Sequence, residues 1–320
     1  AAYSVAVGYE AGKTSQGESA VAIGRVAGSN AQGASTVAVG IAAGQISQNN
    51  FAVAVGREAG CNAQGEFATA VGYQAGEVAQ ADAGVAVGVN AGRNSQGAGA
   101  VAIGNEAGNT SQSNYAIAMG RVAGFNAQGE YAIAMGYQAG SNAQGGAAIA
   151  IGNQAGQNSQ NLNCIAIGTL AGENAQVDYG VALGREAGMN FQGNNGIAVG
   201  RLAGRNLQGL GAVAVGYSAG SNAQGASAIA VGNIAGCSSQ GEQGIAVGNG
   251  AGRNAQGAQG VAVGYVAAYS AQGAHGVAIG YYAGSNAQGD SSVAIGRDAA
   301  KTSQGDNAIA IGYLAGQGSQ

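Results

Sequence analysis

Small and hydrophobic residues alternate in short runs that recur every sixteen residues along the whole chain. With Ala1 as position one, positions four to eight read small-Val-Ala-Val-Gly in Ser4–Gly8, and the pattern returns in Ala20–Gly24 and Ala132–Gly136. Alternation with period two and β-branched residues predict a short strand at these positions. Because the 320 residues divide into twenty such repeats without insertion or deletion, each repeat is expected to stack on the next.

The rest of each repeat predicts two turns and a second extended segment. Gly at positions eight and twelve, such as Gly8 and Gly12, permits positive φ and predicts a turn. Positions thirteen to sixteen, as in Ser29–Gln32, predict another short extended segment. We therefore predict an all-β fold, a parallel β-solenoid or β-roll, in which residues 1–320 form a single repeat domain of twenty 16-residue coils. At about 4.8 Å per coil the rod would be roughly 95 Å long.

The two faces of the first predicted strand differ in side-chain size. Val or Ile at positions five and seven, as in Val5 and Val7, is expected to fill the interior. Positions four, six and eight then point the other way, and they carry small residues such as Ala6 and Gly8. Since an exposed strand face normally carries polar residues, the small-residue face, or the adjoining Gly-Ala edge, is predicted to be an oligomer interface. The alternative is tight packing inside a thin rod.

An invariant Gln at position sixteen predicts a ladder of side-chain amides, each hydrogen-bonded to the coils above and below. The Asn that is common at position fourteen can stack in the same way and tolerates left-handed backbone angles. Such ladders would fix the register between coils. The first members of the Gln ladder are Gln16, Gln32, Gln48, Gln64, Gln80 and Gln96.

Position nine is the candidate surface stripe, because Tyr and Arg, and less often Asn, recur there directly after the invariant Gly. Tyr and Arg are typical anchors of binding surfaces, and a row of them could engage a glycan or a protein multivalently. The alternative is a packing edge, where Arg stacks on the Tyr one coil away. The stripe comprises Tyr9, Arg25, Arg57, Tyr73, Arg121, Tyr137, Arg185, Arg201, Tyr217, Tyr265, Tyr281, Arg297 and Tyr313.

Composition and charge narrow the classes of function. Charged residues make up 8 % and hydrophobic residues 46 % of the chain, which argues against disorder. The net charge of −4 forms no basic patch, so nucleic acid is not an expected partner. Apolar runs are far shorter than the roughly 20 residues of a membrane-spanning helix.

Residues that commonly carry chemistry are rare in the chain. The single His275 occupies a variable turn position, and Cys61, Cys164 and Cys237 are expected to be small apolar fillers. No Cys/His spacing indicates zinc, and Asp is too sparse for a calcium-binding roll. Neither catalysis nor a cofactor or metal site is expected.

The phrase Ser-Val-Ala-Ile-Gly at Ser292–Gly296, with close variants in every repeat such as Cys164–Gly168, resembles the YadA-like head repeat of trimeric autotransporter adhesins. Related repeats occur in phage and large-virus fibre proteins. The resemblance implies a left-handed parallel β-roll, assembled as a homotrimer and displayed on a cell or virion surface. Family repeats are typically shorter and carry Ser after Gly-x-x, where this chain has Ala11 and its equivalents followed by a turn residue.

The leading hypothesis is a structural fibre or adhesin rod, a segment of a longer extracellular fibre protein, that binds other surfaces through variable turn residues. Its expected partners are further copies of itself and a glycan or protein receptor. One alternative is an ice-binding or ice-nucleating solenoid, since ice-nucleation repeats also have sixteen residues, although this chain lacks a Thr-x-Thr array. A second is a self-polymerising filament, because the first and last repeats look like interior ones without a polar cap.

Overall fold

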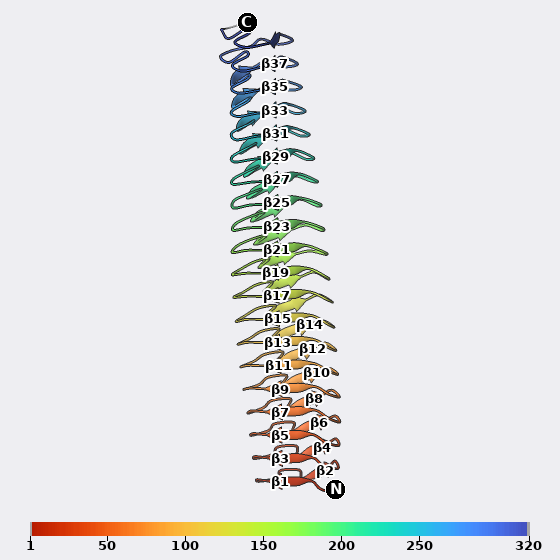
Figure 1. Cartoon of the computed structure of the whole chain (residues 1–320). Coiled ribbons are helices and arrows are strands. Elements are labelled where there is room, and N and C mark those ends of the chain that lie inside the picture. Colours follow the sequence, from red (N-terminus) through yellow and green to blue (C-terminus); the bar gives the residue numbers. More distant parts are fainter. Residues whose placement is uncertain (1, 319–320) are drawn as a thin grey trace. The chain divides into compact units, whose positions relative to one another are not determined.

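Each of the first eighteen sixteen-residue repeats forms one coil with two three-residue strands joined by turns, and the last two repeats contain only the first strand among the described residues. The computed structural model describes residues 2–318 and contains no helix among them. The chain divides into two compact units, Ala1–Asn163 and Cys164–Gln320. Within each unit successive coils stack through parallel strands, as Figure 1 shows. The predicted fold class, an all-β parallel β-solenoid with sixteen-residue coils, is confirmed.

The strands of the first unit fall into two series. The first strand of each coil is β1 (Val5–Val7), β3 (Val21–Ile23), β5 (Val37–Val39), β7 (Val53–Val55), β9 (Thr69–Val71), β11 (Val85–Val87), β13 (Val101–Ile103), β15 (Ile117–Met119), β17 (Ile133–Met135) and β19 (Ile149–Ile151). The second is β2 (Thr14–Gln16), β4 (Asn30–Gln32), β6 (Ile46–Gln48), β8 (Asn62–Gln64), β10 (Val78–Gln80), β12 (Asn94–Gln96), β14 (Thr110–Gln112), β16 (Asn126–Gln128), β18 (Asn142–Gln144) and β20 (Asn158–Gln160).

The second unit repeats the arrangement. Its first strands are β21 (Ile165–Ile167), β23 (Val181–Leu183), β25 (Ile197–Val199), β27 (Val213–Val215), β29 (Ile229–Val231), β31 (Ile245–Val247), β33 (Val261–Val263), β35 (Val277–Ile279), β37 (Val293–Ile295) and β38 (Ile309–Ile311). Its second strands are β22 (Asn174–Gln176), β24 (Asn190–Gln192), β26 (Asn206–Gln208), β28 (Asn222–Gln224), β30 (Ser238–Gln240), β32 (Asn254–Gln256), β34 (Ser270–Gln272) and β36 (Asn286–Gln288).

The register pairs each residue with the residue one full repeat away. Strand β11 pairs with β13 through Ala86 and Ala102, and β12 pairs with β14 through Gln96 and Gln112. Turn residues follow the same rule, since the Val26 amide donates to the Tyr9 carbonyl at 2.8 Å. Coil-to-coil hydrogen bonds therefore run through strands and turns alike, and the sixteen-residue period of the sequence is the period of the backbone.

The interior is lined by Ala, and the prediction that Val and Ile fill it is wrong. Ala22 and Ala86 at position six are 0 % exposed, as are Ala20 and Ala27 at positions four and eleven. Val and Ile at positions five and seven lie on the outer face, where Ile103, for example, is 37 % exposed. The small-residue face is thus not the oligomer interface; the alternative reading, tight packing within the coil, is correct.

The reason for this inversion is the narrow gap between the two strand layers. A Cβ added to Gly44 would lie 2.6 Å from Gln48 Oε1 and 3.3 Å from the Ala38 Cβ. A gap this narrow holds methyl groups and one extended Gln per coil, but not a pair of branched side chains. The alternation correctly predicts the strand, but its buried and exposed faces are the reverse of those predicted.

Left-handed backbone occurs at positions three, ten and fifteen in nearly every coil, as at Ser19, Val26 and Ala31 with φ of 57°, 54° and 55°. The positive φ predicted at Gly is present, as at Gly8 and Gly12 with φ of 130° and 56°. Asn at position fourteen was predicted to tolerate such angles, but in the second strand the left-handed residue is the one at position fifteen, between the two paired residues. Such angles cost a non-Gly residue roughly 1–2 kcal/mol, and they persist because the coil-to-coil hydrogen bonds hold the turn.

Gly at position eight is required for two reasons. Gly24 has φ of 130°, and a Cβ there would lie 2.4 Å from the Gly40 carbonyl oxygen of the next coil. Position twelve is less demanding, because Ala268 and Ala300 occupy it with φ of 46°. The invariant Gly of the motif therefore marks the point where neighbouring coils approach most closely.

Candidate functional site

The Gln at position sixteen crosses the interior and links both strands of its own coil to the next coil. Gln80 Nε2 donates to the Thr69 carbonyl at 2.9 Å, to the Gly84 carbonyl at 3.0 Å and to Gln96 Oε1 at 3.0 Å. Bonds between successive Gln side chains, 2.8–3.3 Å long, run from Gln32 to Gln160 in the first unit and from Gln176 to Gln288 in the second.

Within this ladder Gln16 differs from the later members. Its Nε2 reaches the Val5 and Ala20 carbonyls at 2.9 and 3.3 Å, whereas Gln32 Oε1 has no hydrogen-bond partner among the described residues. Asn side chains at position fourteen form shorter rows, Asn126–Asn142–Asn158 and Asn174–Asn190–Asn206–Asn222. Both ladders join coil to coil. Because the Gln side chains are buried, they hold the scaffold and are not accessible to a ligand.

Polar, charged and aromatic side chains gather at positions nine, ten and thirteen, which we call the turn edge. Along it Arg57 lies over the Tyr73 ring at 5.6 Å, and Arg121 lies over Tyr137 at 5.7 Å. The same geometry joins Arg201 to Tyr217, Arg297 to Tyr281 and Arg297 to Tyr313, and the Tyr265 and Tyr281 rings stack 5.2 Å apart. Most residues of the candidate stripe are therefore engaged with one another, one coil apart.

The remaining stripe residues lie differently. Tyr9 is 71 % exposed, and neither Tyr9 nor Arg25 joins a cation–π pair in the described part of the chain. Arg185 pairs with Glu186 at 3.1 Å, and Glu186 also pairs with Arg205 at 3.1 Å. The stripe thus combines mutually stacked residues with exposed ones.

Ion pairs across the turn edge fix several carboxylates. The pKa of Glu58 lies below its ordinary value, first because Gln74 donates a hydrogen bond of 2.8 Å and then because Arg57 lies beside it. The pKa of Asp298 is also lowered, mainly by the hydrogen bond from Lys301, whose Nζ lies 2.9 Å from the carboxylate. Both groups are ionised at neutral pH, so much of the positive charge along the edge is compensated.

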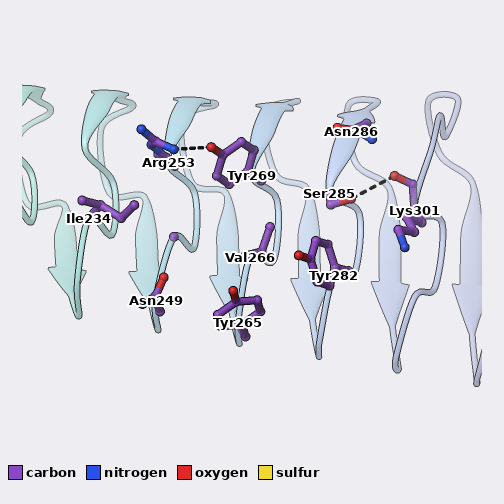
Figure 2. A pocket seen from close by; sticks show the side chains of 11 residues that line it. Ile234, Asn249, Arg253, Tyr265, Val266, Tyr269, Tyr282, Ser285, Asn286 and Lys301 are labelled. Atoms are coloured by element: carbon purple, nitrogen blue, oxygen red, sulfur yellow. Dashed lines mark hydrogen bonds between the residues drawn. The ribbon is translucent and has the colours of Figure 1, made fainter.

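The second unit contains a hollow of about 480 Å³ on its turn edge, shown in Figure 2. It is lined by Ile234, Asn249, Gly250, Arg253, Tyr265, Val266, Tyr269, Tyr282, Ser285, Asn286 and Lys301. Arg253 and Tyr269 lie along one rim and Asn249 and Tyr265 along the other, with Val266 between them (Figure 2). One stripe residue, Tyr265, is thus part of a concave site.

Two cations of the hollow are held against aromatic rings. The Arg253 guanidinium lies 5.2 Å from the Tyr269 ring centroid and hydrogen-bonds to its hydroxyl, and Lys301 Nζ lies 4.9 Å from the Tyr282 ring. The pKa of the Tyr282 phenol is raised, first by desolvation and then by Tyr265, so this hydroxyl keeps its proton. The site offers a guanidinium, phenol hydroxyls and ring faces within one concavity.

Sequence reasoning missed the contributions of positions ten and thirteen to this hollow. Arg253 and Tyr269 share position thirteen, and Gly250 is the one Gly at position ten in the sequence. That substitution is the signal that could have been found, because a missing side chain in a row of larger ones leaves a gap. The gap becomes a site only through the identity of residues one to three coils away, which periodicity alone does not reveal.

Among the described residues no helix is long and apolar enough to cross a membrane, and no group of His, Cys, Asp and Glu is arranged to hold a metal ion. His275 is exposed, and Cys61 and Cys164 are buried. Among the described residues, these observations indicate no candidate site besides the turn edge.

Three segments of the chain match the model of a known protein family. No curated protein matches the chain. The family model for the YadA head domain repeat, which spans two copies, matches residues 127–155, 271–299 and 287–315. Each matched segment contains the apolar strand and the Gly turn of this solenoid, and the first two also contain its Ala-Gly step. These segments of the chain are therefore similar to YadA head domain repeats.

Proposed function

We propose that this chain is a structural segment of an adhesin-type fibre, displayed on a cell or virion surface, with residues 1–320 acting as one repeat domain of a longer protein. The match to the YadA head domain repeat supports an adhesin-like surface protein. The interior is occupied by Ala and the Gln ladder, which leaves the outside of each coil for recognition. A scaffold of this kind presents surfaces and has no need of a reaction centre.

The observation that carries the proposal is the outer Val/Ile face. Val and Ile at positions five and seven form a continuous apolar surface within each unit, with Ile167 and Ile279 exposed by 39 % and 38 %. Fully burying such a side chain is worth about 1.5–3 kcal/mol, so covering the exposed third contributes on the order of 0.5–1 kcal/mol per residue. Repeated in every coil, this gain favours self-association, and we propose a homotrimer joined through this face.

Sedimentation or light scattering of the purified chain tests the assembly. A trimer is expected, and Val213→Lys with Val215→Lys should dissociate it, because two charges would replace apolar contacts at its centre. Ser227→Lys is the matched control. Ser227 is exposed on a turn of the next coil, so a charge there should leave assembly intact. A wild-type chain that stays monomeric at micromolar concentration contradicts the proposed interface.

We further propose that the turn edge contacts the target, a glycan or protein receptor. Its residues vary from coil to coil, and rows of Tyr and Arg can act multivalently. Arg121→Ala with Tyr137→Ala should weaken adhesion of coated beads to host cells or glycan arrays without changing assembly. Equal adhesion by the variant would place recognition elsewhere, whereas thermal hysteresis of the wild type would favour the ice-binding alternative.

A further inference from the structure

The hollow on the turn edge of the second unit has the features of a ligand site. We propose that it binds a carboxylated sugar unit, with tyrosine rings against the C–H faces of the sugar and Arg253 paired with the carboxylate. This inference rests on the proposed function of surface recognition and names a ligand class for one part of that surface. Three features support it: an open space, a mixed aromatic and polar lining, and a cation left for an anionic ligand.

The space exists because Gly250 lacks a side chain between Ile234 and Val266, its equivalents in the adjacent coils. The atoms nearest to a Cβ at Gly250 would be in the Val266 and Tyr269 side chains, at ordinary contact distances of 3.6–3.7 Å. The volume of about 480 Å³ falls within the roughly 300–1,000 Å³ typical of small-molecule sites. The hollow therefore has room for a pyranose ring.

The lining matches the amphipathic character of a sugar. Tyr265 and Tyr282 present rings at 66° to each other with centroids 5.7 Å apart, so two aromatic surfaces meet at an angle. Asn249 and Asn286 supply exposed amides at the rim that can bond ring hydroxyls. A sugar carries C–H faces and hydroxyl edges together, which suits a lining that combines aromatic surfaces with rim amides.

Charge selects an acidic sugar over a neutral one. None of the eleven lining residues is acidic. Lys301 is already paired with Asp298 at 2.9 Å, whereas no carboxylate of the described residues forms an ion pair with Arg253. Arg253 is half-buried and held in place by Tyr269, and its remaining N–H groups can bind a carboxylate in a fork.

The test compares methyl β-D-glucuronide with methyl β-D-glucoside, which differ in a carboxylate replacing a hydroxymethyl group. Ligand-observed NMR and calorimetry on the full chain should show millimolar or tighter binding of the glucuronide and at least tenfold weaker binding of the glucoside. Arg253→Gln should weaken glucuronide binding about tenfold, because it removes a charge-assisted bond. Arg205→Gln is the matched control at the same position of another coil.

A second variant tests the space itself. Gly250→Val places in the hollow the residue that Val266 carries at the same position with φ of 58°, so the fold should tolerate it. It should abolish glucuronide binding, whereas Ala42→Val, at position ten of the first unit, should not. Glucuronide binding that survives Gly250→Val, no binding by the wild type, or stronger binding of an acetylated Glu-containing peptide would each overturn the assignment. If the chain still assembles and adheres in those cases, the proposed function stands and only this site fails.

Discussion

Replacing one buried member of the Gln ladder should destabilise the solenoid well beyond the effect of its lost volume. Gln112 is 1 % exposed and donates to the Val101 carbonyl at 2.9 Å, to the Ala116 carbonyl at 3.0 Å and to Gln128 Oε1 at 3.1 Å. It also accepts a bond from Gln96 Nε2 at 3.3 Å. Gln112→Leu keeps a similar volume and removes all four interactions, so it isolates the ladder from simple packing.

The size of the destabilisation by Gln112→Leu follows from the buried groups that lose a hydrogen bond. The Ala116 carbonyl keeps the bond from the Val101 amide at 2.9 Å, and Gln96 Nε2 keeps two other acceptors, the Val85 and Ala100 carbonyls. Gln128 Oε1 loses its buried donor, at about 1–3 kcal/mol, whereas the Val101 carbonyl lies in the β13–β15 ladder and loses only its second bond, at about 0.5–1.5 kcal/mol. Burial of the Leu methyl groups offsets about 1 kcal/mol. We therefore expect a net loss of about 0.5–3.5 kcal/mol in the free energy of unfolding.

Urea unfolding followed by circular dichroism measures the loss, and hydrogen exchange locates it. Exchange should accelerate first in β12, β14 and β16, because stability in a stacked repeat is largely a sum of nearest-neighbour terms. Gln16→Leu is the control, since Gln16 makes two of these bonds and none to Gln32 in the structure. If Gln112→Leu unfolds within 0.5 kcal/mol of the wild type (roughly the effect of a neutral surface substitution), the ladder is not a stabilising element.

The sequence correctly predicts the strands and turns of the coil but not which face is inside. Alternation at Val101–Ile103 identifies a strand, and Gly at position eight identifies a turn, because both follow from local geometry. The gap between the layers is a property of the closed coil and depends on how far the Gln side chain reaches. From the sequence, the larger apolar residues are predicted to fill the interior, whereas the gap between the layers accommodates Ala.

The sequence likewise predicts only part of the candidate site. Tyr265 was found from its place in a regular stripe, and the cation–π pairing of the stripe was weighed as the packing alternative. Arg253 and Gly250 were missed, since their role depends on Tyr269 one coil away and on Lys301 three coils away. Repeats reveal what every coil shares, and a site made by departures from the repeat requires coordinates.

Three further predictions follow from the packing and charges. Ala86→Val should lower the free energy of unfolding in urea by about 1–3 kcal/mol by overfilling the interior, whereas Val87→Ala on the outer face should lower it less. The reverse order would indicate that Val, and not Ala, lies in the core. Cys61, whose pKa burial raises from 9.0 to about 11, should react with iodoacetamide with a pH midpoint near 11, and a midpoint below 9 would contradict its environment. Gln112→Glu should lose stability as pH rises above about 4.3, the unfolded pKa of Glu, because burial among oxygen acceptors raises the folded pKa; a pH-independent loss would argue against buried acceptors.

The separation of scaffold from turn edge explains how a site can arise in so regular a chain. Ala at positions six and eleven and Gln at position sixteen carry the packing and the ladder, so residues at positions nine, ten and thirteen can change with little effect on the coil. Position ten is left-handed in every coil, at a cost to most residues that Gly does not bear. Gly250 therefore opens a hollow at no backbone cost, and the aromatic and cationic residues of the neighbouring coils line it. A single change in one coil can in this way create a binding site without disturbing the stack that presents it.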